Sequence, residues 1–336
     1  PPPHVDPSPP MTVGVLLAHA TGLAKEVWRP VVRRLSPATQ IEAHYYDLTG
    51  HGEGRDLEVE RCGTPPVWEG FAVDDARRGL ASLPEGLPVV GVGHSIGGAA
   101  MVKLELDHPG SFSRLVLCEP VLLGHDVPFD TRSVLAERTA KRRSHWGSLD
   151  EAREFLRSRP MYQGLDPEAF EAYLEGGLVA MPSGECSLAC RPEVESIMYR
   201  SVGQTVYHRL DQVACPVTIV VGEHSDFVAS VAGVETLRFF ERLAGRFRKA
   251  QVKVMRGVGH LAPLENPAEF ADLVNQAIAA QLQEGGGNKG GAGAGGDVRA
   301  GSGREHGRGA KQKQDWAAAT TMMRVAEEKT VSRSRL

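Results

Sequence analysis

The sequence contains no run of about 18 apolar residues, so it predicts no membrane-spanning helix. It also lacks a strong excess of either charge, and a formal net charge of −4 gives no general attraction for nucleic acid or for a charged membrane surface. No secretory signal peptide is visible near the Pro-rich start. The 41% of hydrophobic residues is nevertheless enough for a sizeable core.

Cysteine is scarce and follows no metal-binding pattern. An odd number of scattered cysteines predicts reduced thiols in an intracellular compartment rather than a disulfide framework. Two of them are four residues apart, but no second pair follows, so a zinc site is not expected. The five cysteines are Cys62, Cys118, Cys186, Cys190 and Cys215.

Short apolar runs, rich in Val, Ile and Leu, alternate with helix-like stretches. Runs without polar alternation are typical of strands buried on both faces. Strands that alternate with helices predict an α/β fold, with a mostly parallel central sheet flanked by crossover helices. The expected strands are Val13–His19, Ile41–Asp47, Leu87–Ser95, Leu115–Glu119, Val217–Gly222 and Val252–Met255, and the clearest helices between them are Glu26–Leu35 and Gly97–Asp107.

This order is interrupted between residues 126 and 210, where the segments look helical. Ser148–Arg157 begins with SLDE, a capping-box pattern, and Pro167–Gly176 is the second clear helix. We expect an all-helical lid over the carboxyl edge of the sheet. The expected divisions are a flexible leader at 1–10, a core at 11–125 and 211–284, the lid at 126–210, and a disordered Gly-rich basic tail at 285–336. The basic tail is compatible with a nucleic-acid arm, but we favour a solvated linker and expect no nucleic-acid partner.

The strongest local signal is a G-x-S-x-G pattern around Ser95. Gly93-His94-Ser95-Ile96-Gly97 follows a strand-like run and precedes a helix-like one, which is the context of a nucleophile elbow. Glycines permit the tight turn, which places the serine in a strained conformation and exposes its hydroxyl. We therefore expect Ser95 to be a catalytic nucleophile.

A serine nucleophile needs a base and an acid that orients the base. His260 follows the last strand-like run, where a loop can reach back across the sheet edge to Ser95. Asp226 follows the run VTIVVGEHS and gives the chain order Ser, Asp, His. Glu119, in LCEP, and Glu223 are the alternative acids. We favour Asp226.

An oxyanion hole needs two N–H donors. The sequence offers one directly after Ser95 and one at the exit of the first strand. The backbone N–H of Ile96 is the first, and Thr21, in the exit of the first strand, is our choice for the second. His94 is expected to pack in the elbow rather than act as a second base. His19 and His51 are expected at the rim of the site, where they could touch substrate, and no spaced ligand set accompanies them, so we expect neither a metal nor a cofactor.

Taken together, these motifs resemble the α/β-hydrolase superfamily, and specifically its lid-bearing serine hydrolases. AHATG with Trp28 looks like the family's oxyanion strand, DLTGHG like its Asp-x-x-Gly-His-Gly loop, and GHSIGG like its elbow. GEHSD and GVGHLAPLENP look like its acid and histidine loops. The resemblance covers roughly residues 13–282.

The chain departs from the family's pattern in two places. Ala20 stands where the family usually has glycine, and Asp226 falls one residue later than in the commoner Gly-x-x-Asp loop, which keeps Glu119 as a rival acid. The first strand also has little sequence before it, so we expect the sheet to lack the usual first hairpin. Ser95 excludes the relatives that place an aspartate nucleophile at this position.

The resemblance implies a carboxylesterase-like enzyme that acts on a small-molecule ester or related acyl substrate through an acyl-enzyme. Acyl transfer, carbon–carbon bond hydrolysis and a non-catalytic receptor remain alternatives. The basic segment AKRRSHW at 140–146 could face an anionic substrate, although such segments are more often solvated helix faces. The terminal Ser334-Arg335-Leu336 resembles a peroxisomal address, which in a eukaryote would be read by an import receptor; otherwise we expect a cytoplasmic protein.

Overall fold

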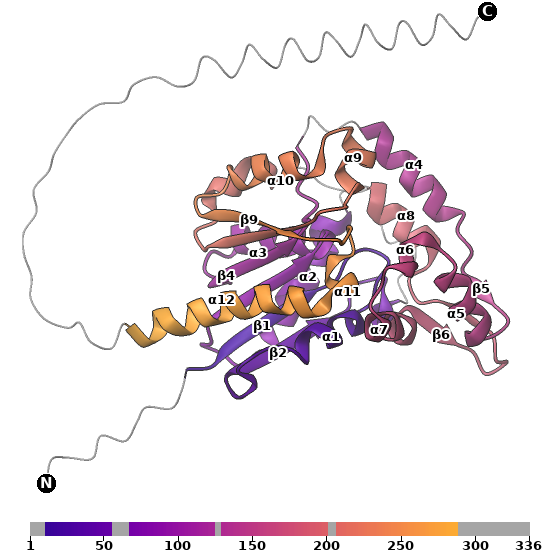
Figure 1. Cartoon of the computed structure of the whole chain (residues 1–336), viewed down its shortest axis with the longest axis horizontal. Helices are drawn as coiled ribbons and strands as arrows, with labels where there is room; N and C mark the ends of the chain where they lie inside the picture. Colours follow the sequence, from indigo (N-terminus) through magenta and orange to yellow (C-terminus); the bar gives the residue numbers. More distant parts are fainter. Residues whose placement is uncertain (1–10, 56–66, 125–128, 201–205, 288–336) are drawn as a thin grey trace, which may run out of the picture. The chain divides into compact units, whose positions relative to one another are not determined.

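The structure is a computed structural model that describes residues 11–55, 67–124, 129–200 and 206–287 (Figure 1). The expected leader at 1–10, nearly all of the expected tail, Cys62 and the terminal Ser334-Arg335-Leu336 lie outside the described residues. The last helix continues to Gly287, so helix extends slightly beyond the boundary expected at residue 285.

A six-stranded sheet, in which every neighbouring pair is parallel, forms the centre of the fold, as the apolar runs predict. The strand order is β2-β1-β3-β4-β8-β9. β1, β3 and β4 are almost wholly buried because helices cover both faces of the sheet. In the described residues no strand precedes β1. The strands are β1 (Val13–Ala18), β2 (Ile41–Tyr46), β3 (Val89–His94), β4 (Arg114–Cys118), β8 (Val217–Gly222) and β9 (Ala250–Met255).

Successive side chains of β1 enter two separate cores, one on each face of the sheet. Val15 and Leu17 belong to the core that contains Trp28 and Phe270, whereas Leu16 belongs to the other. The first core is covered by α1 (Arg29–Val32) and α12 (Pro267–Gly287), and the second by α2 (Val67–Ala81), α3 (Ile96–Asp107) and α10 (Thr236–Ala244). The helix expected at Glu26–Leu35 is divided into η1 (Lys25–Trp28) and α1.

The insertion between β4 and β8 carries most of the remaining helices, and all of these but η5 (Tyr207–Gln212), which contacts α3, lie to the right of the sheet in Figure 1. Its two predicted helices are present, and the Ser148 side chain accepts a hydrogen bond from the Glu151 N–H at 3.1 Å, as the SLDE pattern predicts. The other helices are α4 (Phe129–Ala140), α5 (Leu149–Arg157), α6 (Pro160–Gln163), α7 (Pro167–Gly177) and α8 (Pro192–Arg200).

The expectation of an all-helical lid is wrong. The insertion also contains a small antiparallel sheet in the order β5-β7-β6. Its strands have only two or three residues, too short for an apolar run to mark them in the sequence. They are β5 (His145–Trp146), β6 (Leu178–Ala180) and β7 (Cys186–Leu188).

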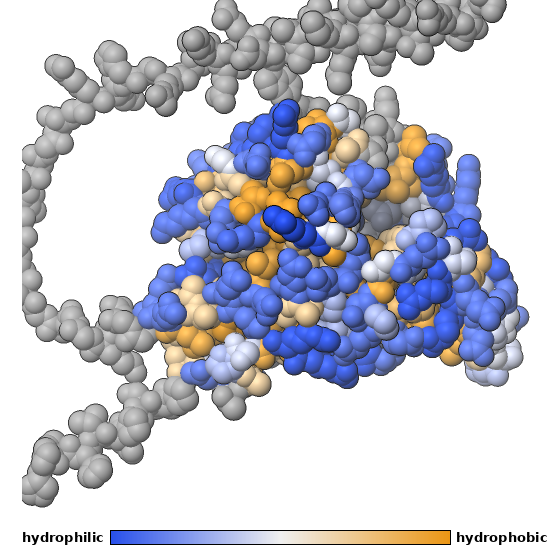
Figure 2. All heavy atoms as spheres, viewed as in Figure 1, coloured by the Kyte–Doolittle hydropathy of each residue, from blue (hydrophilic) through white to orange (hydrophobic). Residues whose placement is uncertain are grey.

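Among the described residues no helix is both long enough and apolar enough to cross a membrane. Figure 2 shows hydrophilic side chains over much of one face, with apolar patches between them. The described cysteines Cys118, Cys186, Cys190 and Cys215 are buried and form no disulfide with one another.

Candidate active site

Ser95 lies at a sharp turn between β3 and α3, as the elbow pattern predicts. Its backbone has φ 55° and ψ −115°, a conformation that is strained for a residue with a side chain. The turn is tied to the next strand, because the Ser95 N–H donates to the Cys118 carbonyl at 2.9 Å and the Ser95 carbonyl accepts from the Val121 N–H at 3.1 Å. The sheet thus holds the serine in this conformation.

The glycines of the elbow are required by close backbone contacts. A Cβ added to Gly97 would lie 2.4 Å from the Ala18 carbonyl oxygen, and one added to Gly93 would lie 2.5 Å from the Cα of Gly98. No larger residue fits at either position without moving backbone. The first turn of α3 therefore packs directly against the end of β1, which brings the Ile96 N–H next to the exit loop of that strand.

His260 is held in its loop by contacts on four sides. Its carbonyl accepts a hydrogen bond from His94 Nε2 at 2.9 Å, and the Phe227 ring stacks on its imidazole with centroids 4.1 Å apart. Glu265 accepts from the N–H groups on both sides, Gly259 at 2.7 Å and Leu261 at 3.1 Å. Burial lowers the pKa of His94, which suits a neutral packing residue rather than a second base.

The carboxylate beside His260 belongs to Glu119. Its Oε2 lies 2.7 Å from His260 Nδ1 and accepts from the Ser225 hydroxyl at 2.7 Å, while its Oε1 accepts from the Gly222 N–H at 2.9 Å. The Glu119 side chain is fully buried. Within the described residues only Ser95 and Glu119 combine a side chain with a positive φ, 55° and 41°. Such strain concentrates at functional sites.

The preference for Asp226 over Glu119 is therefore not supported by the geometry. Asp226 is exposed at the N-terminal end of α9 (Phe227–Ala232), and no hydrogen bond joins it to His260 in the part of the chain that the structure describes. The cause is the one-residue shift in GEHSD, which puts Ser225 at the place of the usual aspartate. Ser225 then contacts Glu119. Glu223, the third alternative, accepts instead from the Gly257 N–H.

Thr21, the predicted second oxyanion donor, lines the same cavity as Ser95. The Gly22 N–H next to it donates to His51 Nε2 at 2.9 Å, and His51 Nδ1 lies 3.3 Å from the Thr49 carbonyl. His19 accepts from the Leu48 N–H at 3.0 Å. The expectation that His19 and His51 touch substrate at the rim is wrong: both are fully buried and hold the two loops together.

His51 can hold this loop only as a neutral ring, because a protonated Nε2 could not accept from Gly22. Burial lowers the pKa of His51 to about 3. Since the unfolded chain then binds the proton more readily, the free energy of unfolding falls as pH drops from the ordinary histidine pKa toward 3, by about 1.4 kcal/mol per pH unit for such a group. We expect His51→Gln to show a weaker loss between pH 7 and pH 5 than the wild type, measured by urea unfolding. An equal loss in both proteins would contradict this.

A cavity of about 800 Å³ lies above Ser95 and His260. Its floor comes from the core and its roof from the lid helices α4, α6 and α8. Ser95 and His260 both line it, although no hydrogen bond joins the two side chains within the described residues, which is common before a substrate binds. Its lid lining includes Val134, Leu135, Arg138, Arg142, Met161 and Glu195.

An ion pair in the lid lies next to the loop that follows β1. Arg142 Nη1 donates to Glu195 Oε2 at 2.7 Å, and Tyr199 donates to the other oxygen at 3.4 Å. A Cβ added to Gly22 would lie 2.5 Å from Glu195 Oε1, so the lid touches this loop directly. Burial raises the pKa of the Glu195 carboxyl, and the Arg142 guanidinium opposes that rise.

Sequence reasoning missed several residues that shape the site, among them Ser225, Glu265, Phe227 and the Arg142–Glu195 pair. Ser225 carried a usable signal, since it occupies the fourth position of the Gly-x-x-Asp pattern, and Arg142 lies in the basic segment 140–146, although nothing in the sequence indicates its pairing with Glu195. Among the described residues no group of three or more His, Cys, Asp or Glu side chains is arranged to hold a metal ion.

Comparison with known proteins identifies the family. The model of the alpha/beta hydrolase family matches residues 15–273. The chain belongs to that family. An abhydrolase domain-containing protein, AFT2-1 of Alternaria alternata, is 27% identical over 216 residues, which cover 56% of this chain and 81% of the relative.

This alpha/beta hydrolase also resembles a curated thioesterase in sequence and a solved structure in fold. A type I acyl-CoA thioesterase, mpaH of Penicillium brevicompactum, is 26% identical over 239 residues, 67% of this chain and 51% of the relative. The peroxisomal alpha-beta-hydrolase Lpx1 of Saccharomyces cerevisiae has a similar fold, with a TM-score of 0.63, 15% identity, and coverage of 95% of this chain and 86% of Lpx1. The family supports a hydrolase activity.

Proposed function

We propose that the protein is a serine hydrolase that cleaves an ester or thioester through an acyl-enzyme, with Ser95 as nucleophile, His260 as base and Glu119 as acid. One observation carries the proposal: the strained Ser95 and His260 line one cavity, and the imidazole of His260 is held by a buried carboxylate. A serine, a base and an orienting acid are the requirements of this chemistry.

In the proposed reaction His260 Nε2 takes the proton of the Ser95 hydroxyl while the serine oxygen attacks the acyl carbon. The N–H groups of Ile96 and Thr21 bind the developing oxyanion. His260 then gives its proton to the departing alcohol or thiol, and the acyl group remains on Ser95. Water, deprotonated by His260, releases the acid and restores the serine. Glu119 stays ionised and keeps the Nδ1 proton directed at itself.

The lid favours an acyl group of some length. Val134, Leu135 and Met161 give the cavity an apolar part, and its volume of about 800 Å³ exceeds the need of an acetyl group. The acyl-CoA thioesterase among the relatives supports a thioester as a substrate class. Import into peroxisomes through Ser334-Arg335-Leu336 stays a prediction, because these residues lie outside the described part of the chain.

A fluorophosphonate probe tests the proposal directly. The Ser95 oxygen should attack phosphorus and expel fluoride, and the protein should gain the mass of the phosphonyl group. We expect peptide mapping to find the adduct on Ser95 alone, and prior incubation with excess thioester substrate to slow its formation. A folded protein that forms no adduct, or forms it on another residue, would contradict the proposal and favour a ligand receptor on this fold.

A further inference from the structure

We propose that Arg138, on lid helix α4, is a specificity residue that binds an anionic group of the substrate at the cavity. The inference rests on the proposed function and goes beyond it by assigning a charge to the substrate. The residues of this helix and the turn after it that line the cavity are Val134, Leu135, Arg138, Thr139 and Arg142.

The spacing of these residues shows that the face is continuous. They are separated by one, three or four positions, so they form a single stripe along the helix axis. Along this stripe the surface changes from apolar, at Val134 and Leu135, to cationic, at Arg138 and Arg142. Val134 is 50% exposed, and Met161, on lid helix α6, is 52% exposed. An amphiphilic substrate, apolar at one end and anionic at the other, matches this change.

The two arginines on the stripe differ in their partners. Arg142 is neutralised by the buried Glu195. Arg138 is exposed, and in the described residues no carboxylate lies within ion-pair distance of it. Its guanidinium is therefore available to a ligand, and a guanidinium binds carboxylate or phosphate in a two-pronged arrangement that few neutral groups can match.

The three carboxylates that line the cavity differ in whether they already have partners, and so in how far they can neutralise the Arg138 guanidinium. Glu195 is paired with Arg142, and Glu265 accepts two backbone N–H bonds in the histidine loop. Like Glu265, Asp226 has no ion-pair partner within the described residues, and its side chain is exposed. Arg138 belongs to lid helix α4, so an anion bound to it is attached to the roof of the cavity.

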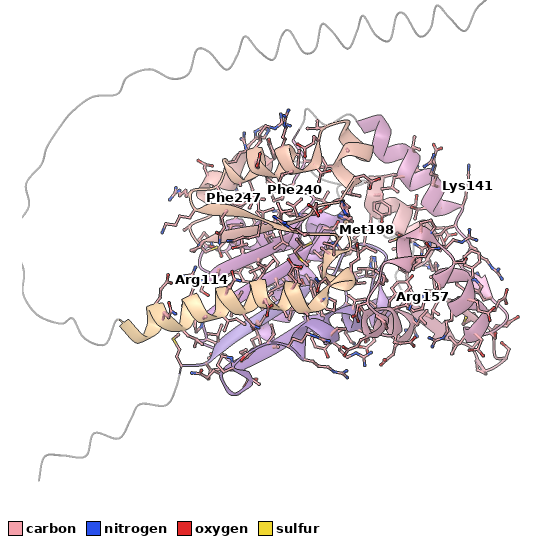
Figure 3. The ribbon with its side chains drawn as sticks, in the orientation of Figure 1. Arg114, Lys141, Arg157, Met198, Phe240 and Phe247 are labelled. Carbon is pink, nitrogen blue, oxygen red and sulfur yellow. The ribbon has the colours of Figure 1, made fainter. Side chains whose placement is uncertain are left out.

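The anion could belong to the acyl part, as a carboxylate, or to the leaving group, as the phosphates of a coenzyme A thioester. Three substrates separate these sources: octanoyl-N-acetylcysteamine, which is uncharged, octanoyl-CoA, and the p-nitrophenyl monoester of a dicarboxylic acid. For each, kcat/KM is measured in the full-length wild type and in Arg138→Gln, Arg138→Lys and Lys141→Gln. Lys141, labelled in Figure 3, is a matched control because it directly follows α4, is exposed and is not among the residues that line the cavity.

We expect Arg138→Gln to lower the ratio of kcat/KM for one anionic substrate to that for the uncharged thioester by about tenfold, the size of one charge-assisted contact. Arg138→Lys should lower this ratio less than Arg138→Gln does, and Lys141→Gln should leave it at the wild-type value. Salt should lower the ratio in the wild type more than in Arg138→Gln. The anionic substrate that is affected identifies the source of the charge.

An unchanged ratio in Arg138→Gln for both anionic substrates would overturn the inference. An equal fall of the ratio in Lys141→Gln would also overturn it, because it would indicate a general electrostatic effect of positive charge and not a contact with Arg138. Failure of the proposed function has a different result. In that case the wild type would form no Ser95 adduct with the fluorophosphonate, whereas failure of this inference alone would leave the adduct intact in every variant.

Discussion

Ser95→Ala and His260→Ala are each expected to lower kcat by about 10⁶, and the double variant to lose no more than either alone, because nucleophile and base act as one unit. The alanine side chain has no hydroxyl to attack the acyl carbon. Without the imidazole, the Ser95 hydroxyl keeps its proton and is a poor nucleophile. Rates are to be measured with p-nitrophenyl octanoate under substrate saturation, with burst kinetics to detect the acyl-enzyme.

Ser82→Ala is the matched control for this experiment. Ser82 is exposed at the end of α2, where its hydroxyl donates to the Arg78 carbonyl at 3.1 Å, and it has no part in the cavity. Circular dichroism and thermal unfolding should show that all variants are folded. If the two losses add instead of overlapping, or if Ser95→Ala keeps a burst, Ser95 and His260 do not form one nucleophilic unit.

The second large effect concerns the acid. Glu119→Gln should lower kcat by about 10⁴, the cost of turning the base into the wrong tautomer. The amide of glutamine can donate a hydrogen bond to His260 Nδ1, which would move the imidazole proton to Nε2 and leave no base facing Ser95. With the amide nitrogen at the place of Oε2, the Ser225 hydroxyl loses its acceptor, whereas the remaining amide oxygen can still accept from the Gly222 N–H.

Asp226→Asn separates the two candidate acids. It removes one negative charge from the same cavity but leaves the contact between Glu119 and His260 intact, so its kcat should fall by less than about tenfold, the scale of an exposed charge. The comparison uses an uncharged ester at pH 8. If Asp226→Asn loses more activity than Glu119→Gln, the acid is Asp226, and the contact seen between Glu119 and His260 is not the one used in catalysis.

The central sheet was predictable because each of its strands is a run of buried apolar residues. For β1, β3 and β8 the first and last residues of the predicted strands lie within two residues of those of the observed strands. A residue buried on both faces of a sheet leaves a signal in the sequence itself. The strands of the lid leave none, because two or three residues such as His145–Trp146 are too few for any pattern.

The site was predictable where the backbone restricts the residue type and unpredictable where a contact depends on loop register. Ser95 could be identified from its glycines, which the structure shows to be sterically required. The acid could not be settled, since Glu119 and Asp226 both follow a strand at the same edge of the sheet. A shift of one residue in the loop after β8 decides which of the two reaches His260, and sequence does not fix the rotation of that loop.

The insertion of the lid between β4 and β8 has an evolutionary consequence. Glu119 precedes residue 126, and Ser225 and His260 follow residue 210, so the proposed chemical machinery lies wholly outside the insertion. The lid supplies the roof of the cavity, including Arg138 and Met161, and touches the loop of Gly22 through Glu195. Selection can therefore alter, lengthen or replace residues 126–210 and change the preferred substrate while the reaction is inherited unchanged. Divergence within the family should accumulate fastest in this segment.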